Sequence, residues 1–474
     1  MSNYQFLLSV AEPLGDAIAI QQDLTLTIQD PDKLSERIEH VVRTATLGNE
    51  RSKPLAQWLI RMLALEYGAI PASIHDHYMA HGQRSIRNDF TVPAMNLRAL
   101  TFQAARAIFR SAKRIDAKAF IFEIARSEMG YTQQPPAEYA ASILGAAIAE
   151  KYRGPVFIQG DHFQVSASRY QKDAKAEMDA IRALIVESLN AGFYNIDIDS
   201  STLVDLSKDS IPEQQKLNCD LSAELAAFVR SEEPEGITVS LGGEIGEVGG
   251  HNSTEEELSA YIKGFNSRLH ELMPGAIGLS KISIQTGTSH GGVVLPDGTV
   301  ASVKVDFDCM RELSDVAKRY GAGGAVQHGA STLPEEAFSK FPEADALEIH
   351  LATNFQNILF DYLPELLRKE IYDHLNENFG GDRKEGESEE QFLYKARKRA
   401  MGIFKESFWN MDPAVIHRIE SAWEAQFTKL FQSLNIKGTR IEIEETVHPI
   451  VVKPALSSYI GTTDRDEDVS DLAD

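Results

Sequence analysis

The pattern of apolar and polar positions divides the chain into three zones. In residues 1–90, stretches such as 34–47 and 54–68 carry apolar residues three and four positions apart, which predicts a mostly helical segment. From about 91 to 360, short β-rich runs alternate with amphipathic helical stretches. Residues 361–474 return to helical spacing as an extension and end in an acidic stretch, TTDRDEDVSDLAD, which lacks apolar anchors. We expect this tail to be disordered.

Eight short runs in the middle zone are typical of buried strands. In chain order they are FTVPAMN, AFIFEIA, PVFIQGDH, YNIDIDSS, ITVSLGGEIG, KISIQTGTSH, GAVQHGAS and ALEIHLAT. Helical stretches at 177–192 and 254–273 fall between runs, as crossovers between parallel strands require. Eight β/α units over 91–360 predict an α/β fold, a (β/α)8 TIM barrel. A doubly wound open sheet is the alternative, but no G-x-G-x-x-G turn follows the first run.

Two segments of the C-terminal zone carry expectations of their own. The stretch IKGTRIEIEETVHPIVV, residues 436–452, alternates apolar and charged positions and predicts one or two added strands. The basic stretch KARKRAM, residues 395–401, is expected to be the solvated face of a helix.

Composition limits the function further. The formal net charge of −23 argues against a nucleic-acid partner, which would need a basic surface. No run of eighteen apolar residues appears, so we expect no membrane span, and the N-terminus does not resemble a secretory signal. Two distant cysteines exclude a disulfide framework and favour the cytoplasm.

Polar side chains gather where the predicted strands end. The third run ends in Asp161-His162, the fifth in Glu244, the sixth in His290 and the seventh in His328. Catalytic groups of a TIM barrel lie at these carboxyl ends, so the side chains should converge. Three imidazoles with an open position describe a catalytic zinc site, although ligand type alone does not exclude another divalent ion.

Several short motifs occur in a characteristic order. They are Val92-Pro93-Ala94-Met95-Asn96, then Asp161-His162, then the stretch from Glu244 to Gly250, then Gly287 to Gly291, and finally His328-Gly329-Ala330-Ser331. This series resembles the class II, metal-dependent fructose-bisphosphate aldolase superfamily. The stretch NAGFYNIDIDSST, residues 190–202, is also similar to the accessory subunit of tagatose-bisphosphate aldolases.

The resemblance implies roles for individual residues. His162, His290 and His328 would bind zinc, with Glu244 near a second or alternative metal position, and a monovalent cation is allowed as a further cofactor. Asp161 would handle the proton of a substrate hydroxyl. The residues expected to bind the substrate and its phosphate are Asn96, Gly287, Gly291, Gly329, Ser331 and Thr353. The activity implied is aldol cleavage or condensation of a ketose phosphate through an enediolate, in carbohydrate metabolism such as glycolysis, by a homo-oligomer.

The sequence departs from the family pattern at two places. The loop that usually supplies a proton-transfer Glu holds His251 and Asn252, with Glu247 nearby, so Glu247 and His251 are the candidate acid and base at carbon. The last strand reads HLAT instead of N-x-D-T, and only Thr353 matches. A metal-dependent epimerase or isomerase of a ketose or uronate is therefore an alternative. A non-catalytic aldolase partner subunit is another.

A separate histidine cluster precedes the first predicted strand. His75, His77 and His81 lie in IHDHYMAHGQRSIR, and the last two would share one helix face. This cluster could form a second metal site or contact a substrate anion, or it could be a polar lead-in segment without a ligand.

Overall fold

The computed structural model describes residues 3–246, 251–287, 305–330, 333–460 and 472. Its central sheet closes on itself, because β6 pairs with both β5 and β7 and the other strands follow in sequence order around the ring. All of these pairings are parallel. The predicted TIM barrel is confirmed. Within the described residues, no helix is long and apolar enough to cross a membrane.

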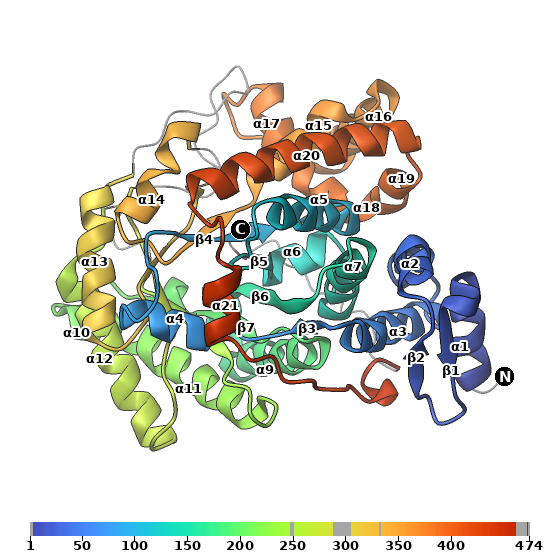
Figure 1. The fold of residues 1–474 in the computed structure, drawn as a ribbon. Coiled ribbons are helices and arrows are strands. Elements are labelled where there is room, and N and C mark those ends of the chain that lie inside the picture. Colours follow the sequence, from blue (N-terminus) through green and yellow to red (C-terminus); the bar gives the residue numbers. More distant parts are fainter. Residues whose placement is uncertain (1–2, 247–250, 288–304, 331–332, 461–471, 473–474) are drawn as a thin grey trace.

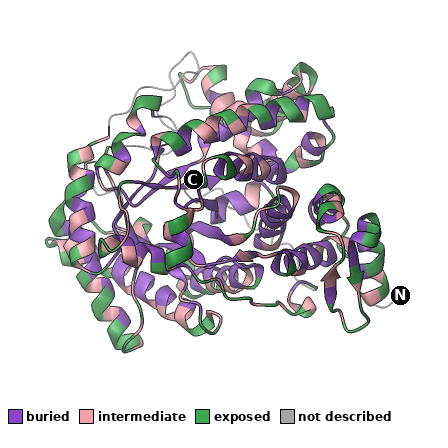
Figure 2. Ribbon diagram, viewed as in Figure 1, coloured by how far each residue is buried: buried purple, intermediate pink, exposed green. Residues whose placement is uncertain are grey.

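Each of the eight barrel strands overlaps one of the eight predicted runs, and only β6 extends beyond its run. The strands are β4 (Val92–Asn96), β5 (Ile121–Ala125), β6 (Gly154–Gln164), β7 (Asn195–Asp199), β8 (Ser240–Glu244), β9 (Lys281–Ile284), β10 (Ala325–Gln327) and β11 (Glu348–Leu351). They are buried almost throughout, as expected for parallel strands covered by helices (Figure 2).

Helices between the strands form the outer layer (Figure 1). The longer ones are α5 (Thr101–Arg114), α7 (Pro136–Ala149), α9 (Ala174–Ala191), α11 (Lys216–Glu232), α12 (Glu255–Leu272), α13 (Phe307–Arg319) and α15 (Thr353–Tyr362). Local chemistry sets their limits. In α9, the Asp173 side chain caps the first turn, and Gly192 ends the helix with a φ of 97°, a left-handed conformation that favours glycine. Short helices such as α6 (Arg126–Tyr131) and α8 (Ala167–Lys172) follow strands directly at the carboxyl-end mouth.

The N-terminal zone covers one side and one end of the barrel. Helices α1 (Asn3–Ala11), α2 (Pro31–Leu47) and α3 (Ser52–Tyr67) pack together, and a small hairpin, β1 (Ile18–Ile20) and β2 (Leu26–Ile28), joins them. Strand β3 (Ala69–Pro71) then pairs with the start of β6. Helix α4 (His75–Gly82) follows and lies at the amino-end mouth, where Nδ1 of His75 is 2.7 Å from Oγ of Ser280, the residue before β9.

The C-terminal zone is helical: α16 (Glu365–Phe379), α17 (Glu389–Ala396), α18 (Ala400–Ile403), α19 (Lys405–Trp409), α20 (Pro413–Ser433) and α21 (Arg440–Thr446). Helix α20 runs along α5 (Figure 1). The strands predicted within 436–452 are wrong, because residues 440–446 form α21, which packs on α4. The eight barrel strands each have two neighbours, so the barrel itself offers that alternating sequence no edge to pair with.

Two other expectations for this zone have different outcomes. The stretch 395–401 is not a solvated helix face, because Arg397 is only 7% exposed and the chain around it folds into short turns against the barrel. Of the predicted acidic tail, only Leu472 is among the described residues, so its predicted disorder stays a prediction.

Candidate metal centre and active site

A β-bulge in β6 places two adjacent side chains inside the barrel. The register between β6 and β7 shifts between Gly160 and Phe163, and His162 within the shift has a φ of +40°. In a regular strand Asp161 and His162 would point to opposite faces, whereas the extra residue of a bulge re-aims a side chain. Phe163 takes the outer side and covers Gly160, where a Cβ would lie 2.3 Å from its ring.

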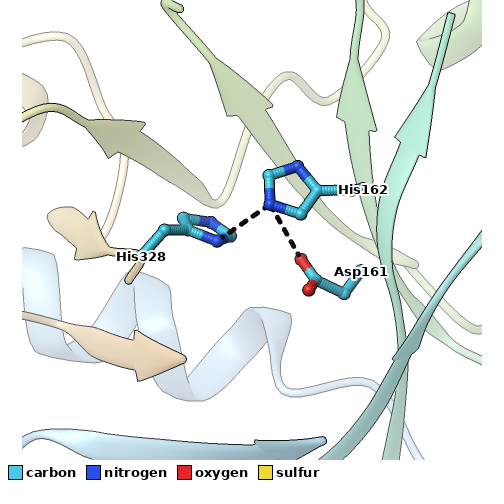
Figure 3. Close-up of side chains that lie close together, drawn as sticks. All are labelled: Asp161, His162 and His328. Atoms are coloured by element: carbon cyan, nitrogen blue, oxygen red, sulfur yellow. Dashed lines mark hydrogen bonds and ion pairs between the residues drawn. The ribbon is translucent and has the colours of Figure 1, made fainter. Parts of the chain in front are cut away.

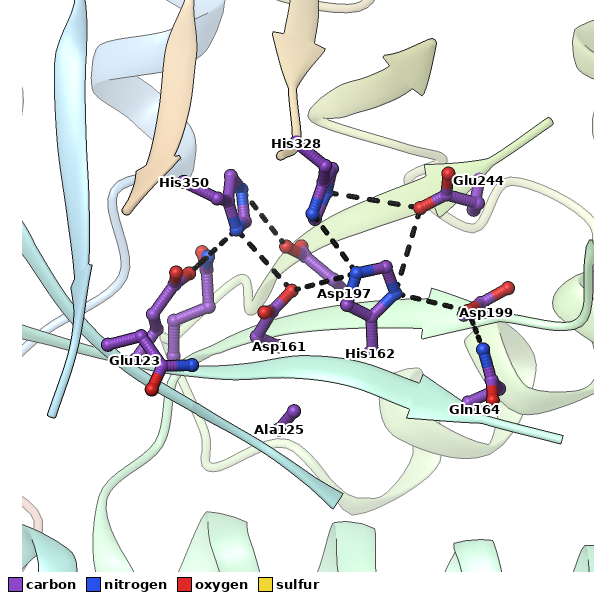
Figure 4. Close-up of polar contacts among 12 residues, drawn as sticks. Glu123, Ala125, Asp161, His162, Gln164, Asp197, Asp199, Glu244, His328 and His350 are labelled. Atoms are coloured by element: carbon purple, nitrogen blue, oxygen red, sulfur yellow. Dashed lines mark hydrogen bonds and ion pairs between the residues drawn. The ribbon is translucent and has the colours of Figure 1, made fainter. Parts of the chain in front are cut away.

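His162 lies at the centre of a compact polar cluster. Its Nε2 is 3.0 Å from Nδ1 of His328, which follows β10, and 3.8 Å from Oδ1 of Asp161 (Figure 3). Its Nδ1 is 3.1 Å from Oδ2 of Asp199 on β7 and 3.8 Å from Oε2 of Glu244 on β8 (Figure 4). The same Glu244 oxygen is 3.9 Å from Nε2 of His328.

These donors fit a divalent cation. Ligand atoms of Asp161, His162 and His328 lie within 4.8 Å of one another, and so do those of His162, Asp199 and Glu244. Imidazole nitrogens and carboxylate oxygens are the ligands of catalytic zinc sites, which leave one position open for water or substrate. The described residues therefore bring together two of the three predicted histidines and the predicted Glu244.

The electrostatics of the cluster are those of a cation site. Burial acts to lower the pKa of His162, but Asp161, Asp199 and Glu244 hold that pKa well above its usual value. Burial raises the pKa of Glu244 to about 8. The carboxylates thus favour positive charge among them, and a bound metal would supply it in place of protons.

His350, on β11, belongs to the same site. Its ring stacks on His328 with centroids 3.9 Å apart. Its Nδ1 is 2.8 Å from Oε2 of Glu123 and 3.4 Å from Oδ1 of Asp161 (Figure 4). Burial acts to lower its pKa, but these carboxylates hold the pKa of His350 well above its usual value. His350 therefore connects the candidate metal cluster to the carboxylates of the barrel interior.

A buried lysine forms the floor of the site. Nζ of Lys281, at the start of β9, lies 2.9 Å from Oδ2 of Asp197, donates to Oε1 of Gln159 at 2.8 Å and pairs with Glu348. Burial acts to raise the pKa of Glu348, but the Lys281 charge brings it down to about 2. Gly242 makes room here, since a Cβ on it would lie 2.1 Å from Oδ1 of Asp197.

Comparison with known proteins identifies the family. The model of the family described as fructose-bisphosphate aldolase class-II matches residues 80–412. The chain belongs to the class II fructose-bisphosphate aldolase family.

Solved structures of this family's fold are distant in sequence. A fructuronate-tagaturonate epimerase from Cohnella laeviribosi is 12% identical over 81% of this chain and 86% of that chain, with a TM-score of 0.53. A probable tagatose 6 phosphate kinase from Sinorhizobium meliloti 1021 is 16% identical over 78% of this chain and 97% of that chain, with a TM-score of 0.51. No curated protein matches the chain.

Several residues predicted from the family pattern are placed by the structure. Asn96 ends β4 and donates to Glu128 on α6. Thr353 begins α15 and is buried. Gly287 and Gly329 have φ values of 95° and 68°, which glycine adopts without strain. The side chain of His251 is 55% exposed and its Nδ1 lies 2.7 Å from the carbonyl oxygen of Asn252. Glu247, His290, Gly291 and Ser331 lie outside the described residues.

Some site residues carry no motif in the sequence because they lie inside strands whose runs are mainly apolar. His350 departs from the family pattern, and Glu123, Lys281 and Glu348 belong to none of the motifs. A signal was available: Glu348 and His350 are two positions apart on β11, so they share the inward face.

The early histidine cluster belongs to the core at the opposite mouth. His75, His77 and His81 are all buried, with Nδ1 of each near Ser280, Thr446 and the Gly323 carbonyl, respectively. Within the described part of the chain, none of the three joins a metal-type cluster. They are therefore buried packing residues of α4 rather than a polar lead-in segment.

Proposed function

We propose that the protein is a metal-dependent lyase of the class II aldolase type, which cleaves and forms a carbon–carbon bond of a ketose phosphate. The observation that carries the proposal is the cluster of His162, His328, Asp161 and Glu244 at the carboxyl-end mouth of the barrel. Such a cluster is what aldol chemistry through an enediolate requires.

Each side chain has a role in this proposal. His162, His328 and Glu244 would hold the cation, and His290 completes the set predicted from the family pattern. When bound, a divalent ion acts as a Lewis acid towards the substrate carbonyl. Asp161 would accept the proton of a substrate hydroxyl. Nδ1 of His350, 3.4 Å from Oδ1 of Asp161, would orient that carboxylate through its charge.

A second candidate is an epimerase that uses the same site without releasing fragments. The observation that favours it is His350, an imidazole beside Asp161 where the family pattern has Asn. The pair provides two adjacent groups that can carry a proton. The Cohnella laeviribosi epimerase, which shares the fold, makes uronates sensible test substrates alongside ketose phosphates.

The test is metal analysis followed by a product screen. Purified protein is analysed for bound metal and then assayed with ketose phosphates and ketouronates, scoring aldehyde release and epimer formation separately. We expect a stoichiometric divalent metal and aldehyde release. Epimer formation without aldehyde would replace the first candidate by the second. A metal-free protein without turnover would support a non-catalytic partner subunit.

His162→Ala provides the matched test of the site. We expect loss of bound metal and of activity, with an unchanged circular dichroism spectrum. His417→Ala, at an exposed position on α20, is the control and should behave as wild type. Full metal content and normal turnover in His162→Ala would contradict the assignment.

We also propose that the protein is a cytoplasmic homo-oligomer. Light scattering on the peak eluted from a size-exclusion column checks the oligomeric state.

A further inference from the structure

Helix α4 is seated closely against the amino-end mouth of the barrel. A Cβ on Gly82, its last residue, would lie 2.7 Å from the carbonyl oxygen of Ala322, in the turn before β10. A Cβ on Gly323 in that turn would lie 2.6 Å from the carbonyl oxygen of Tyr78. Glycine at these two positions lets the backbones of the helix and the turn approach each other. The helix is therefore held in one place relative to the barrel strands.

Tyr78 connects α4 to the interior of the barrel. The residue is fully buried, and its hydroxyl donates to Oε2 of Glu348 on β11, 270 positions away in the chain. Burial, and then the charge of Glu348, hold the pKa of Tyr78 well above its usual value, so the hydroxyl keeps its proton. A hydrogen bond to an ionised group is about twice as strong as one between neutral groups. The hydroxyl thus fixes one oxygen of the carboxylate.

The other oxygen of the same carboxylate faces the candidate active site. Oε1 of Glu348 lies 2.7 Å from Nε2 of His350. This oxygen also accepts from Gln159 at 3.0 Å and pairs with Lys281. Nδ1 of His350 lies 3.4 Å from Oδ1 of Asp161 (Figure 4). A continuous line of contacts therefore runs from the amino-end helix to the carboxylate beside the candidate metal cluster.

The contact with Glu348 decides which way the His350 ring faces. The ring stacks on His328 with an interplanar angle of 29°. Stacking is compatible with two ring orientations that differ by a half-turn about χ2, a torsion with roughly two-fold preference in histidine. Only one of them brings Nε2 to Glu348 and Nδ1 to Asp161. A carboxylate held rigidly at Glu348 therefore selects the orientation that the site uses.

We propose that Tyr78 is a positioning residue of the active site, whose hydroxyl holds the Glu348 carboxylate and thereby the His350 ring beside Asp161. The inference rests on the proposed function for the part that Asp161 plays in proton transfer. Tyr78 precedes the residues matched by the family model, 80–412. The proposal therefore gives the N-terminal zone, through α4, a part in the reaction that the barrel motifs do not provide.

The first test is the steady-state kinetics of metal-loaded Tyr78→Phe, which loses the hydroxyl and keeps the ring. We expect kcat to fall by about 10- to 100-fold with little change in KM, because a small misplacement of a catalytic group is costly while substrate binding is untouched. Tyr152→Phe is the matched control, because its hydroxyl donates to the carbonyl oxygen of Pro155 at 2.7 Å, at the start of β6. An unchanged kcat in Tyr78→Phe, or an equal fall in Tyr152→Phe, would overturn the proposal.

A double variant tests whether Tyr78 acts through Glu348. If it does, Tyr78→Phe/Glu348→Gln should have the kcat of Glu348→Gln alone, because the second substitution has already removed the group that Tyr78 holds. Two independent falls in kcat that multiply in the double variant would show another route and contradict the inference.

A spectroscopic test separates this inference from the proposed function. Zinc-loaded protein with 13Cε1-labelled histidine gives a His350 signal, identified by its loss in His350→Asn. This signal should shift in Tyr78→Phe and stay in place in Tyr152→Phe, which would support the positioning role whether or not any sugar is cleaved. An unchanged signal in Tyr78→Phe would refute the role even with the lyase activity confirmed. Should Tyr78→Phe not fold, Gly323→Ala, which displaces α4 at Tyr78, must move the same signal.

Discussion

Lys281→Met removes the only lysine among the described residues of the barrel interior, and its consequence follows from the charges around it. In the wild type, Nζ of Lys281 forms ion pairs with Asp197 and Glu348 and donates to Gln159. Methionine fills a similar volume, so the substitution chiefly removes the charge. Loss of one partner from a buried ion pair costs about 3–5 kcal/mol, because the remaining charge is left without compensation. We expect a destabilisation of this size.

Chemical denaturation measures the effect, and a second variant checks its cause. The urea midpoint of Lys281→Met should fall well below that of wild type. The double variant Lys281→Met/Glu348→Gln should recover part of the loss, because it also removes a carboxylate left unpaired. Lys263→Met, on the outer helix α12, is the control. A destabilisation below about 1 kcal/mol, in the range of exposed pairs, would refute the view that Lys281 balances buried charge.

Three further predictions concern single positions. Burial lowers the pKa of His77 to about 3, so as pH falls below about 6.5 the unfolded chain takes up a proton that the folded chain does not. Between these pH values the unfolding free energy of wild type should fall by up to about 1.4 kcal/mol per pH unit, and that of His77→Gln should fall less steeply in denaturation series. Identical slopes would argue against a buried neutral imidazole. Gly242→Ala should destabilise by about 1–3 kcal/mol because its Cβ would meet Asp197, and a wild-type melting temperature would contradict this. His350→Asn should keep its metal by elemental analysis while kcat falls by about 100-fold, and wild-type turnover would remove His350 from the mechanism.

The barrel could be predicted because the sequence signals for its strands and helices are local. Each strand is a short apolar run and each covering helix repeats its apolar positions every three or four residues, so order and spacing alone indicated eight β/α units. The polar residues at strand ends were visible for the same reason. In a parallel barrel all carboxyl ends share one mouth, which is why Asp161, His162, Glu244 and His328 could be grouped before any contact was known.

Other features depend on contacts between distant segments. The inward direction of His162 depends on a bulge against β7, and strict alternation would have turned it away from Asp161. Residues 440–446 alternate like a strand but form a helix that packs on α4, a contact between segments far apart in the chain. Lys398 reaches Tyr131 across more than two hundred and sixty residues.

The sequence by itself determined the fold class, the family and several candidate metal ligands, because local periodicity and motif order carry that information. Only the tertiary structure decided which of these groups meet: His350 with Asp161, Lys281 with Glu348, and the Lys398 ammonium with the Tyr131 ring. Such pairs form when strands and helices far apart in the chain pack together, so no short stretch of sequence indicates which residues will be neighbours.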